Sequence, residues 1–431
     1  MEVEGERPLK LYFIPYLAAG HMIPLCDIAQ SFALRGHHVT IITTPSNAQI
    51  LTESDNFRVH TLEFPSKEVG LPDGVESLSA VTDIDKSYRV FIASTLLREP
   101  IEGFVEQHPP DCIIADFLYP WIHELAKKLG IPRLVFNGFS LFTICAMESV
   151  KTNRIDVSTP FVIPDFPHCI TMNSTPPEDS RGIMEPLLTV ALQSDGFIIN
   201  SFVELDGEEY LRHYERTTGH KAWHLGPAWL VAVEKAERGQ KSVVSAQECL
   251  SWLDSKRAKS VVEEREGEES EQEKEKWLPK GFEERNKKKG MIIKGWAPQV
   301  VILGHPAIGA FVTHCGWNST VEGVSAGVPL ITWPVHSDQF YNEKLITRVR
   351  GIGVEVGADE WTLCGFYETQ KLLPRDRIQA AVRKVMDTDL GHHIRLRAKE
   401  FGKTATHAVR EAGSSYNNLT ALIHHLKTLR A

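Results

Sequence analysis

Residues 11–45 read LYFIPYLAAGHMIPLCDIAQSFALRGHHVTIITTP and contain the pattern that decides the fold. A short apolar run at residues 11–15 leads into a loop, which is followed by a segment with a helical period. The apolar residues of that period are Leu25, Ile28, Ala29 and Phe32. Gly36 is a typical helix stop, and residues 38–45 form a second apolar run. The order predicts a strand, a helix and a second strand of one parallel sheet.

The same alternation of short apolar runs and helical patterns continues along the chain. Runs of the strand type occur at residues 111–116, 133–138, 195–201, 309–314 and 329–334. Helical patterns occur at residues 120–130, 297–304, 319–327, 375–387 and 414–426. This order predicts an α/β fold with doubly wound parallel sheets, whose ligands bind beyond the carboxyl ends of the strands. Because 431 residues exceed the size of one hydrophobic core, we expect two Rossmann-like domains that face each other across a cleft.

An interruption in the pattern sets the predicted domain boundary. Glycine, lysine and small residues break the periodicity between residues 228 and 245, and we interpret this segment as a linker. The N-terminal domain is then residues 1–227 and the C-terminal domain is residues 246–414. We expect the last helical segment, residues 415–431, to pack back on the N-terminal domain.

The bulk composition excludes several classes of protein. Hydrophobic residues make up 42% of the chain and charged residues 24%, as in globular proteins. The net charge of -9, without a clustered basic face, argues against nucleic-acid binding. The first ten residues do not resemble a signal peptide, and no apolar run reaches the roughly 18 residues of a membrane span, so we expect a soluble cytoplasmic protein. The seven cysteines include no CxxC pair, which favours reduced core residues over disulfides or a metal site.

Two residues of the first half suggest acid–base chemistry. His21 follows the first predicted strand, in a loop that Gly20 allows to turn sharply, and Asp116 ends another predicted strand. In a parallel sheet both side chains can reach the same edge, where a buried carboxylate would fix the tautomer of the imidazole and stabilise its protonated form. The alternatives are a surface histidine and a helix N-cap at Asp116.

A second group of residues lies between 296 and 339. The segment THCGWNST, residues 313–320, comes directly from a strand, and the N–H groups of Asn318, Ser319 and Thr320 at the following helix start form an anion site. His314 lies where a pyrophosphate would arrive, although packing at the strand end is the alternative.

Further side chains of this stretch suit the other parts of a nucleotide sugar. Glu322 can accept hydrogen bonds from ribose hydroxyls, or it can lie on a solvated helix face. Trp296 offers a flat surface for a base, or it can be a core tryptophan. Asp338 and Gln339 supply acceptors and a donor for sugar hydroxyls.

Residues 296–339 resemble the 44-residue signature box of plant secondary-product glycosyltransferases, the family 1 UDP-glycosyltransferases with the two-domain GT-B fold. The resemblance extends to AAGHMIP, DCIIADFLYPW, GIPRLVF, INSFVELD, WLPKGFEER and FYNEKL. It implies that His21 is the catalytic base and that Asp116 orients it. It implies a uracil site at Trp296, Ala297 and Gln299, and a ribose ligand at Glu322. It implies phosphate contacts at His314, Asn318 and Ser319, and sugar contacts at Trp317, Asp338 and Gln339.

The resemblance also implies the reaction. We expect inverting transfer of a sugar from a UDP-sugar to a hydroxyl or carboxyl of a small apolar plant metabolite, such as a triterpenoid saponin or flavonoid. Trp317 and Gln339 favour UDP-glucose, while xylose and other sugars stay open. We expect a monomer without a cofactor. We also expect no metal ion, because the one DxD of the first domain, Asp83 to Asp85, lies in a polar helical stretch and not at a strand end. A dinucleotide oxidoreductase fits less well, since no GxGxxG links a strand to a helix.

The chain departs from the family pattern at one place. After Val262 the family has a strand, a Gly-Ser phosphate loop, a helix and a second strand, whereas here a glutamate-rich run follows directly. This implies loss of a block of about one βαβ unit, as in a splice variant, an incorrect gene model or an edited sequence. The loss would expose sheet edges and apolar surface. The alternative function is therefore a variant that binds the acceptor without turnover.

Overall fold

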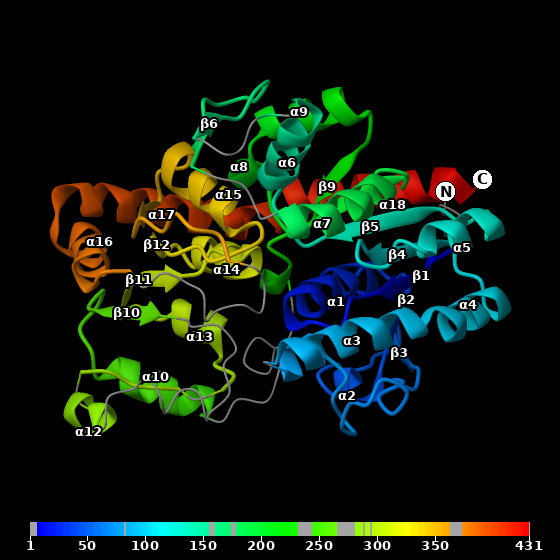
Figure 1. The fold of residues 1–431 in the computed structure, drawn as a ribbon, viewed down its shortest axis with the longest axis horizontal. Helices are drawn as coiled ribbons and strands as arrows, with labels where there is room; N and C mark the ends of the chain where they lie inside the picture. The colour runs from blue at the N-terminus through cyan, green and yellow to red at the C-terminus, as the bar shows by residue number, and fades with distance from the viewer. Residues whose placement is uncertain are drawn as a thin grey trace, which may run out of the picture. The chain divides into compact units, whose positions relative to one another are not determined.

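The chain forms two compact units, each with its own parallel sheet. A computed structural model describes residues 7–81, 83–153, 155, 160–173, 178–231, 244–264, 281–287, 289–293, 295–362 and 373–430. The first unit comprises Met1–Ala232, Trp361–Tyr367 and Ala405–Ala431, and the second comprises Val233–Glu360 and Glu368–Thr404. Figure 1 labels their helices and strands. The predicted α/β class with two Rossmann-like sheets is confirmed.

The first unit is built on a sheet whose strand order is β3-β2-β1-β4-β5-β8-β9, with every neighbouring pair parallel. The strands are β1 (Lys10–Ile14), β2 (His38–Thr43), β3 (Phe57–Thr61), β4 (Cys112–Asp116), β5 (Arg133–Asn137), β8 (Gly196–Ile199) and β9 (Ala222–His224). A separate antiparallel pair is formed by β6 (Phe161–Val162) and β7 (Thr171–Met172). The helices are α1 (Ala19–Ala33), α2 (Pro45–Ala48), α3 (Ile84–Leu96), α4 (Arg98–Gln107), α5 (Ile122–Leu129), α6 (Leu141–Asn153), α7 (Glu178–Ala191), α8 (Val203–Asp206), α9 (Glu208–Thr218) and α18 (Ser414–Arg430).

The central strands β1, β4, β5 and β8 are buried on both faces, which explains why they are mostly apolar runs without regular polar alternation, whereas the edge strand β3 alternates. Leu11 and Phe13 of β1 belong to one core cluster, together with residues of α1 and with Leu419, Leu422 and Leu426 of α18. Tyr12 and Ile14 belong to a second cluster, which includes residues of α3, α4 and α5. The helices α1 and α18 therefore cover one face, and α3, α4 and α5 contribute to the other.

The second unit has a smaller parallel sheet in the order β10-β11-β12-β13. Its strands are β10 (Val261–Glu264), β11 (Ile308–Thr313), β12 (Leu330–Thr332) and β13 (Gly353–Glu355). The helices are α10 (Ala246–Asp254), α12 (Phe282–Asn286), α13 (Gln299–Leu303), α14 (Trp317–Ser325), α15 (Gln339–Lys344), α16 (Arg375–Asp387) and α17 (Asp389–Ala408), and a π-helical turn, Leu345–Val349, follows α15. The long helix α17 was not predicted, because its many charged residues obscure its apolar period.

The departure from the family pattern falls at β10. Within the described ranges β10 pairs with β11 alone, so its other side has no strand neighbour there. Met291 and Ile292 belong to no strand and are 37% and 39% exposed. Most of the predicted linker and of the glutamate-rich run lies outside the described residues.

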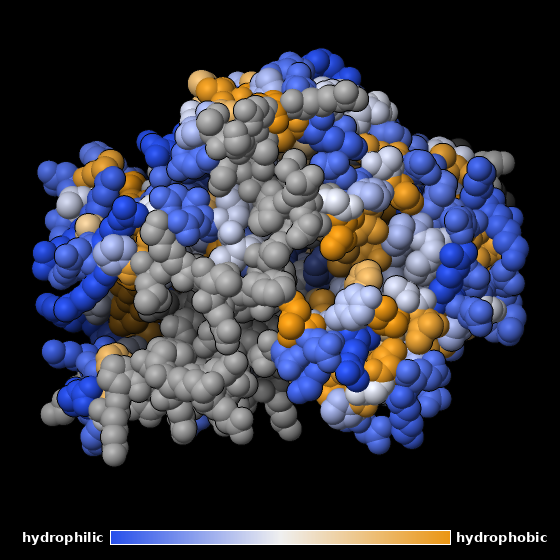
Figure 2. All heavy atoms as spheres, viewed as in Figure 1, coloured by the Kyte–Doolittle hydropathy of each residue, from blue (hydrophilic) through white to orange (hydrophobic). Residues whose placement is uncertain are grey.

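The surface of the described residues is mixed in character. On the face that Figure 2 shows, hydrophilic residues are interspersed with hydrophobic patches. In the ranges that the structure covers, no helix has both the length and the apolar character to cross a membrane. Five of the six described cysteines are buried, whereas Cys169 is exposed. Cys364 lies outside the described residues.

Candidate functional site

A histidine–aspartate pair lies at the carboxyl edge of the first unit's sheet. β1 and β4 are adjacent and parallel, with Ile14 opposite Ala115, so the residues that follow β1 lie beside the end of β4. His21 Nδ1 lies 2.7 Å from Asp116 Oδ2. Asp116 is 1% exposed, and its Oδ1 accepts a hydrogen bond from the N–H of Leu118 at 3.0 Å. The structure thus brings the two predicted residues together.

This geometry assigns the tautomer of His21. A carboxylate only accepts, so Nδ1 carries the hydrogen that it donates to Asp116, and Nε2 carries the lone pair. The side chain of His21 is 24% exposed, whereas that of Asp116 is fully buried. One detail of the prediction was wrong: His21 lies in the first turn of α1 and not in a loop, because the helix already begins at Ala19.

Aromatic rings surround the imidazole of His21. The ring centroid of Tyr16 lies 5.8 Å away and that of Phe117 lies 6.2 Å away. Burial raises the pKa of Tyr16 to about 12, so the phenol stays neutral at physiological pH. Phe117 packs in turn against Phe139, at 5.6 Å between centroids. His21 therefore lies beside aromatic side chains that suit an apolar ligand.

A second group of predicted residues lies in the second unit, at the turn between β11 and α14. Cys315 has a φ of +67°, which is unusual for a residue other than glycine, and Gly316 is the N-cap of α14. A Cβ added to Gly316 would clash with Nε2 of His314, so a larger residue here would force the imidazole to move. Asn318 and Ser319 occupy the first turn of α14, where N–H groups point out of the helix start. The predicted phosphate contacts therefore gather at one helix terminus.

The predicted ribose ligand is buried. Glu322 is 7% exposed, which excludes the alternative of a solvated helix face. Gln299 Nε2 donates to Glu322 Oε2 at 2.5 Å and lies 3.4 Å from Oγ of Ser319. Trp296 and Ala297 are half-buried and directly precede α13, which begins at Gln299. The structure thus joins the predicted uracil and ribose residues through Gln299.

The predicted sugar contacts lie at the start of α15. Gln339 Oε1 accepts hydrogen bonds from the N–H groups of Val335 at 2.8 Å and His336 at 2.9 Å. This arrangement leaves Nε2 as the donor of the amide, and Nε2 lies 3.5 Å from Nδ1 of His336. Asp338, 7% exposed, accepts a hydrogen bond from Asn342 Nδ2 at 2.5 Å. Burial lowers the pKa of His336 to about 4, so this neighbour is neutral at physiological pH.

Two further findings concern residues outside the predicted site. Asn342 was missed, although its spacing of four residues from Asp338 along a helix signals a contact. Asp83 caps α3 by accepting hydrogen bonds from the N–H groups of Asp85 and Lys86, and Asp85 pairs with Arg89. The DxD is thus structural. In the described part of the chain, no three His, Cys, Asp or Glu residues are placed to hold a metal ion together.

Comparison with known proteins places the chain among glycosyltransferases. The family profile described as "UDP-glucoronosyl and UDP-glucosyl transferase" matches residues 273–384. The chain is 42% identical to a UDP-glucosyl transferase of Saponaria officinalis, with 99% of this chain and 98% of that protein covered. It is 41% identical to UDP-glucose flavonoid 3-O-glucosyltransferase 7 of Fragaria ananassa, with 100% and 98% covered. The crystal structure of Glycyrrhiza uralensis UGT73P12, complexed with glycyrrhetinic acid 3-O-monoglucuronide, matches with a TM-score of 0.88 at 33% identity, over 98% of this chain and 96% of that chain.

The length of these alignments bears on the departure at β10. The alignment with the Saponaria protein spans 482 positions, whereas this chain has 431 residues, so at least 51 positions have no counterpart here. The identity and coverage are nevertheless far above what a shared fold alone requires. The chain therefore belongs to the UDP-glycosyltransferase family with the GT-B fold.

Proposed function

We propose that this protein transfers glucose from UDP-glucose to a hydroxyl or carboxyl group of a small apolar plant metabolite, with inversion, to give a β-glycoside. The observation that carries the proposal is the 2.7 Å contact between His21 and the buried Asp116, beside aromatic rings. The name of the Fragaria protein favours a flavonoid as acceptor, and the ligand of the Glycyrrhiza structure, glycyrrhetinic acid 3-O-monoglucuronide, favours a triterpenoid saponin. The first unit would bind the acceptor and the second the UDP-sugar, in a monomeric cytoplasmic enzyme.

The reaction would begin at Nε2 of His21. This nitrogen removes the proton of the acceptor hydroxyl, while Asp116 stabilises the imidazolium that forms. The acceptor oxygen attacks the anomeric carbon in line, and the bond from that carbon to the UDP oxygen breaks. An α-linked donor therefore gives a β-glycoside. The departing UDP keeps the bonding electron pair, and the N-terminus of α14 and His314 stabilise its charge without a metal ion.

The donor would lie along the buried side chains of the second unit. Trp296 and the backbone of Ala297 would contact uracil, and Glu322 would accept hydrogen bonds from the ribose. Phosphate contacts would come from His314, Asn318 and Ser319, and sugar contacts from Trp317, Asp338 and Gln339. Because Gln339 Oε1 accepts from two backbone N–H groups, its amide would donate to the sugar, whereas Asp338 would accept.

Calorimetric titration of UDP tests the donor site first. We expect micromolar binding that Glu322→Ala abolishes, because this change removes the buried ribose acceptor. Transfer of glucose to a panel of flavonoids and triterpenoids then tests catalysis, and His21→Ala should lose transfer while it keeps UDP affinity. Turnover by His21→Ala would refute the proposed base.

The alternative is a variant that binds the acceptor without turnover. It is favoured by the 51 or more family positions that have no counterpart in this chain. A folded protein that binds a flavonoid but not UDP would support this alternative.

A further inference from the structure

A buried asparagine connects two segments of the donor site. Asn342 lies on α15 and is fully buried. Its Nδ2 donates to the carbonyl oxygen of Cys315 at 2.9 Å and to Oδ2 of Asp338 at 2.5 Å. The first bond reaches the turn before α14, and the second reaches the residue before α15. One amide group thus holds both segments in a fixed relation.

The hydrogen bond to Cys315 stabilises a turn whose left-handed backbone raises the free energy of any residue other than glycine. Cys315 has a left-handed φ of +67°, and such a conformation persists only where surrounding contacts hold it. Its N–H lies 3.2 Å from Oγ1 of Thr313, and its carbonyl accepts from Asn342. The next residue, Gly316, is the N-cap of α14. The direction in which α14 presents its first N–H groups therefore depends on the side chain of Asn342.

The bond to Asp338 fixes the orientation of a carboxylate. Asp338 is 7% exposed, and with Oδ2 held by Asn342, its Oδ1 has a defined direction. An amide suits this place, because Nδ2 has two hydrogens for two acceptors. An aspartate of the same shape would present an acceptor to a carbonyl and a carboxylate, which would repel it.

We propose that Asn342 is a positioning residue for the UDP-sugar, which sets the sugar-binding carboxylate of Asp338 relative to the phosphate-binding start of α14. The inference rests on the proposed function, since it assumes that these two segments bind sugar and phosphate. Asn342 contacts neither substrate and acts through Asp338 and Cys315.

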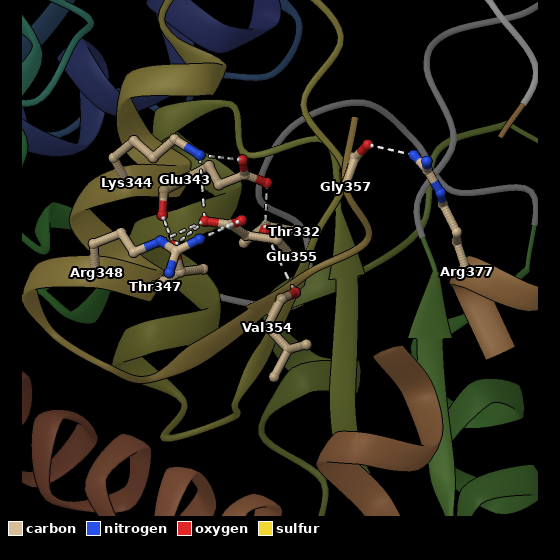
Figure 3. Close-up of polar contacts among 9 residues, drawn as sticks. All are labelled: Thr332, Glu343, Lys344, Thr347, Arg348, Val354, Glu355, Gly357 and Arg377. Carbon is tan, nitrogen blue, oxygen red and sulfur yellow. Dashed lines mark hydrogen bonds and ion pairs between the residues drawn. The ribbon is translucent and has the colours of Figure 1, made fainter. Parts of the chain in front are cut away.

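The π-helical turn that follows α15 provides a matched control at Thr347. Figure 3 shows Lys344, Thr347 and Arg348 pointing toward Glu355 of β13. Thr347 Oγ1 donates to Glu355 Oε1 at 2.9 Å and lies 2.8 Å from the carbonyl oxygen of Glu343. Thr347→Val keeps the shape of the side chain and removes its one hydroxyl donor. It should lower the stability of the same helical segment without a change at the donor residues.

The experiment compares the affinities for UDP and UDP-glucose by calorimetry in the wild type, Asn342→Ala and Thr347→Val, together with their melting temperatures. We expect Asn342→Ala to weaken UDP-glucose binding at least about 10-fold more than UDP binding, because the lost hydrogen bond involves a charged group. Thr347→Val should lower the melting temperature and leave the ratio of the two affinities unchanged. If Asn342→Ala does not fold, Asn342→Ser serves, since one hydroxyl hydrogen cannot serve both acceptors.

A double-mutant cycle separates positioning from general destabilisation. In an Asp338→Ala background, Asn342→Ala should cause no further change in the ratio of UDP-glucose to UDP affinity. An equal loss of both affinities in Asn342→Ala, or full additivity with Asp338→Ala, would overturn the inference while the proposed function stands. A wild type that binds neither ligand would overturn the proposed function and, with it, this inference.

Discussion

A buried carboxyl group in the second unit leads to a prediction about pH. Glu343 is 1% exposed, and burial raises its pKa from 4.5 to about 7, against the opposing effect of Lys344. Its Oε2 accepts from the hydroxyl of Thr332 at 2.7 Å, and its Oε1 lies 3.2 Å from Nζ of Lys344, as Figure 3 shows. We expect Glu343→Gln, which has the same shape but no charge, to remove a pH-dependent cost of folding.

The sign and size follow from proton linkage. Between pH 4.5 and 7 the unfolded chain has already lost the proton that the folded state keeps on Glu343, so the wild type loses stability as the pH rises. With pKa values of 4.5 and about 7, this loss amounts to about 2.5 kcal/mol between pH 5 and pH 8, at about 1.36 kcal/mol per unit. For a unit of roughly 150–250 residues, the loss corresponds to about 5–10 °C in melting temperature.

The assay is thermal unfolding of the wild type and Glu343→Gln between pH 5 and pH 8, with the transition of the second unit compared at each pH. The advantage of Glu343→Gln should grow with pH. Glu355→Gln is the control: burial opposes the ionisation of Glu355, but Lys344, Thr347 and Arg348 outweigh it and lower its pKa. Its stabilisation is present above the unfolded pKa, so this variant should be less stable than the wild type from pH 6 to pH 8. The difference should narrow as the pH rises, because the charge of Glu355 also raises the pKa of Glu343. A constant difference between Glu343→Gln and the wild type would refute the reasoning.

Three further predictions concern catalysis and donor binding. Asp116→Asn should lower the transfer rate by roughly 100- to 10,000-fold, because the amide no longer fixes the tautomer of His21. Calorimetry should show an unchanged affinity for UDP. A transfer rate equal to that of the wild type would exclude a role for Asp116 in catalysis. Gly316→Ala should weaken UDP binding, because the new methyl group falls on the ring of His314, whereas Gly103→Ala on α4, where the added methyl group meets no atom, should have no effect. Chelation of divalent cations should leave transfer unchanged; a loss that Mg²⁺ or Mn²⁺ restores would contradict the proposed stabilisation of UDP by α14.

The sequence was informative where one local pattern has one structural meaning. The apolar runs of β1, β4, β11 and β12 were predicted because strands buried on both faces have few polar residues. His21 and Asp116 were paired because both follow such runs, but the alternation of elements does not state that β1 lies beside β4. That adjacency depends on the order of strands in the sheet, which arises from long-range packing.

The role of Asn342 shows a different limit. FYNEKL was noticed as part of a resemblance, yet nothing local indicates that the amide of Asn342 reaches Cys315, 27 positions earlier in the chain. The contact exists because the turn after β11 and helix α15, which follows β12, meet at one sheet edge. It also depends on the left-handed φ of Cys315, which is unusual for cysteine. Sequence patterns therefore predicted the strands but not this contact between the segments that follow them.

The donor residues depend on two buried strands of the second unit. The loop after β11 carries His314, and the loop after β12 carries Asp338, while Thr313 and Thr332, which end these strands, are fully buried. The N–H of Trp333 donates to the carbonyl of Thr313 at 2.9 Å, so the two strand ends are joined directly. β10 provides none of these residues. A loss next to β10 would therefore leave in place the proposed phosphate and sugar contacts, which the loops after β11 and β12 carry.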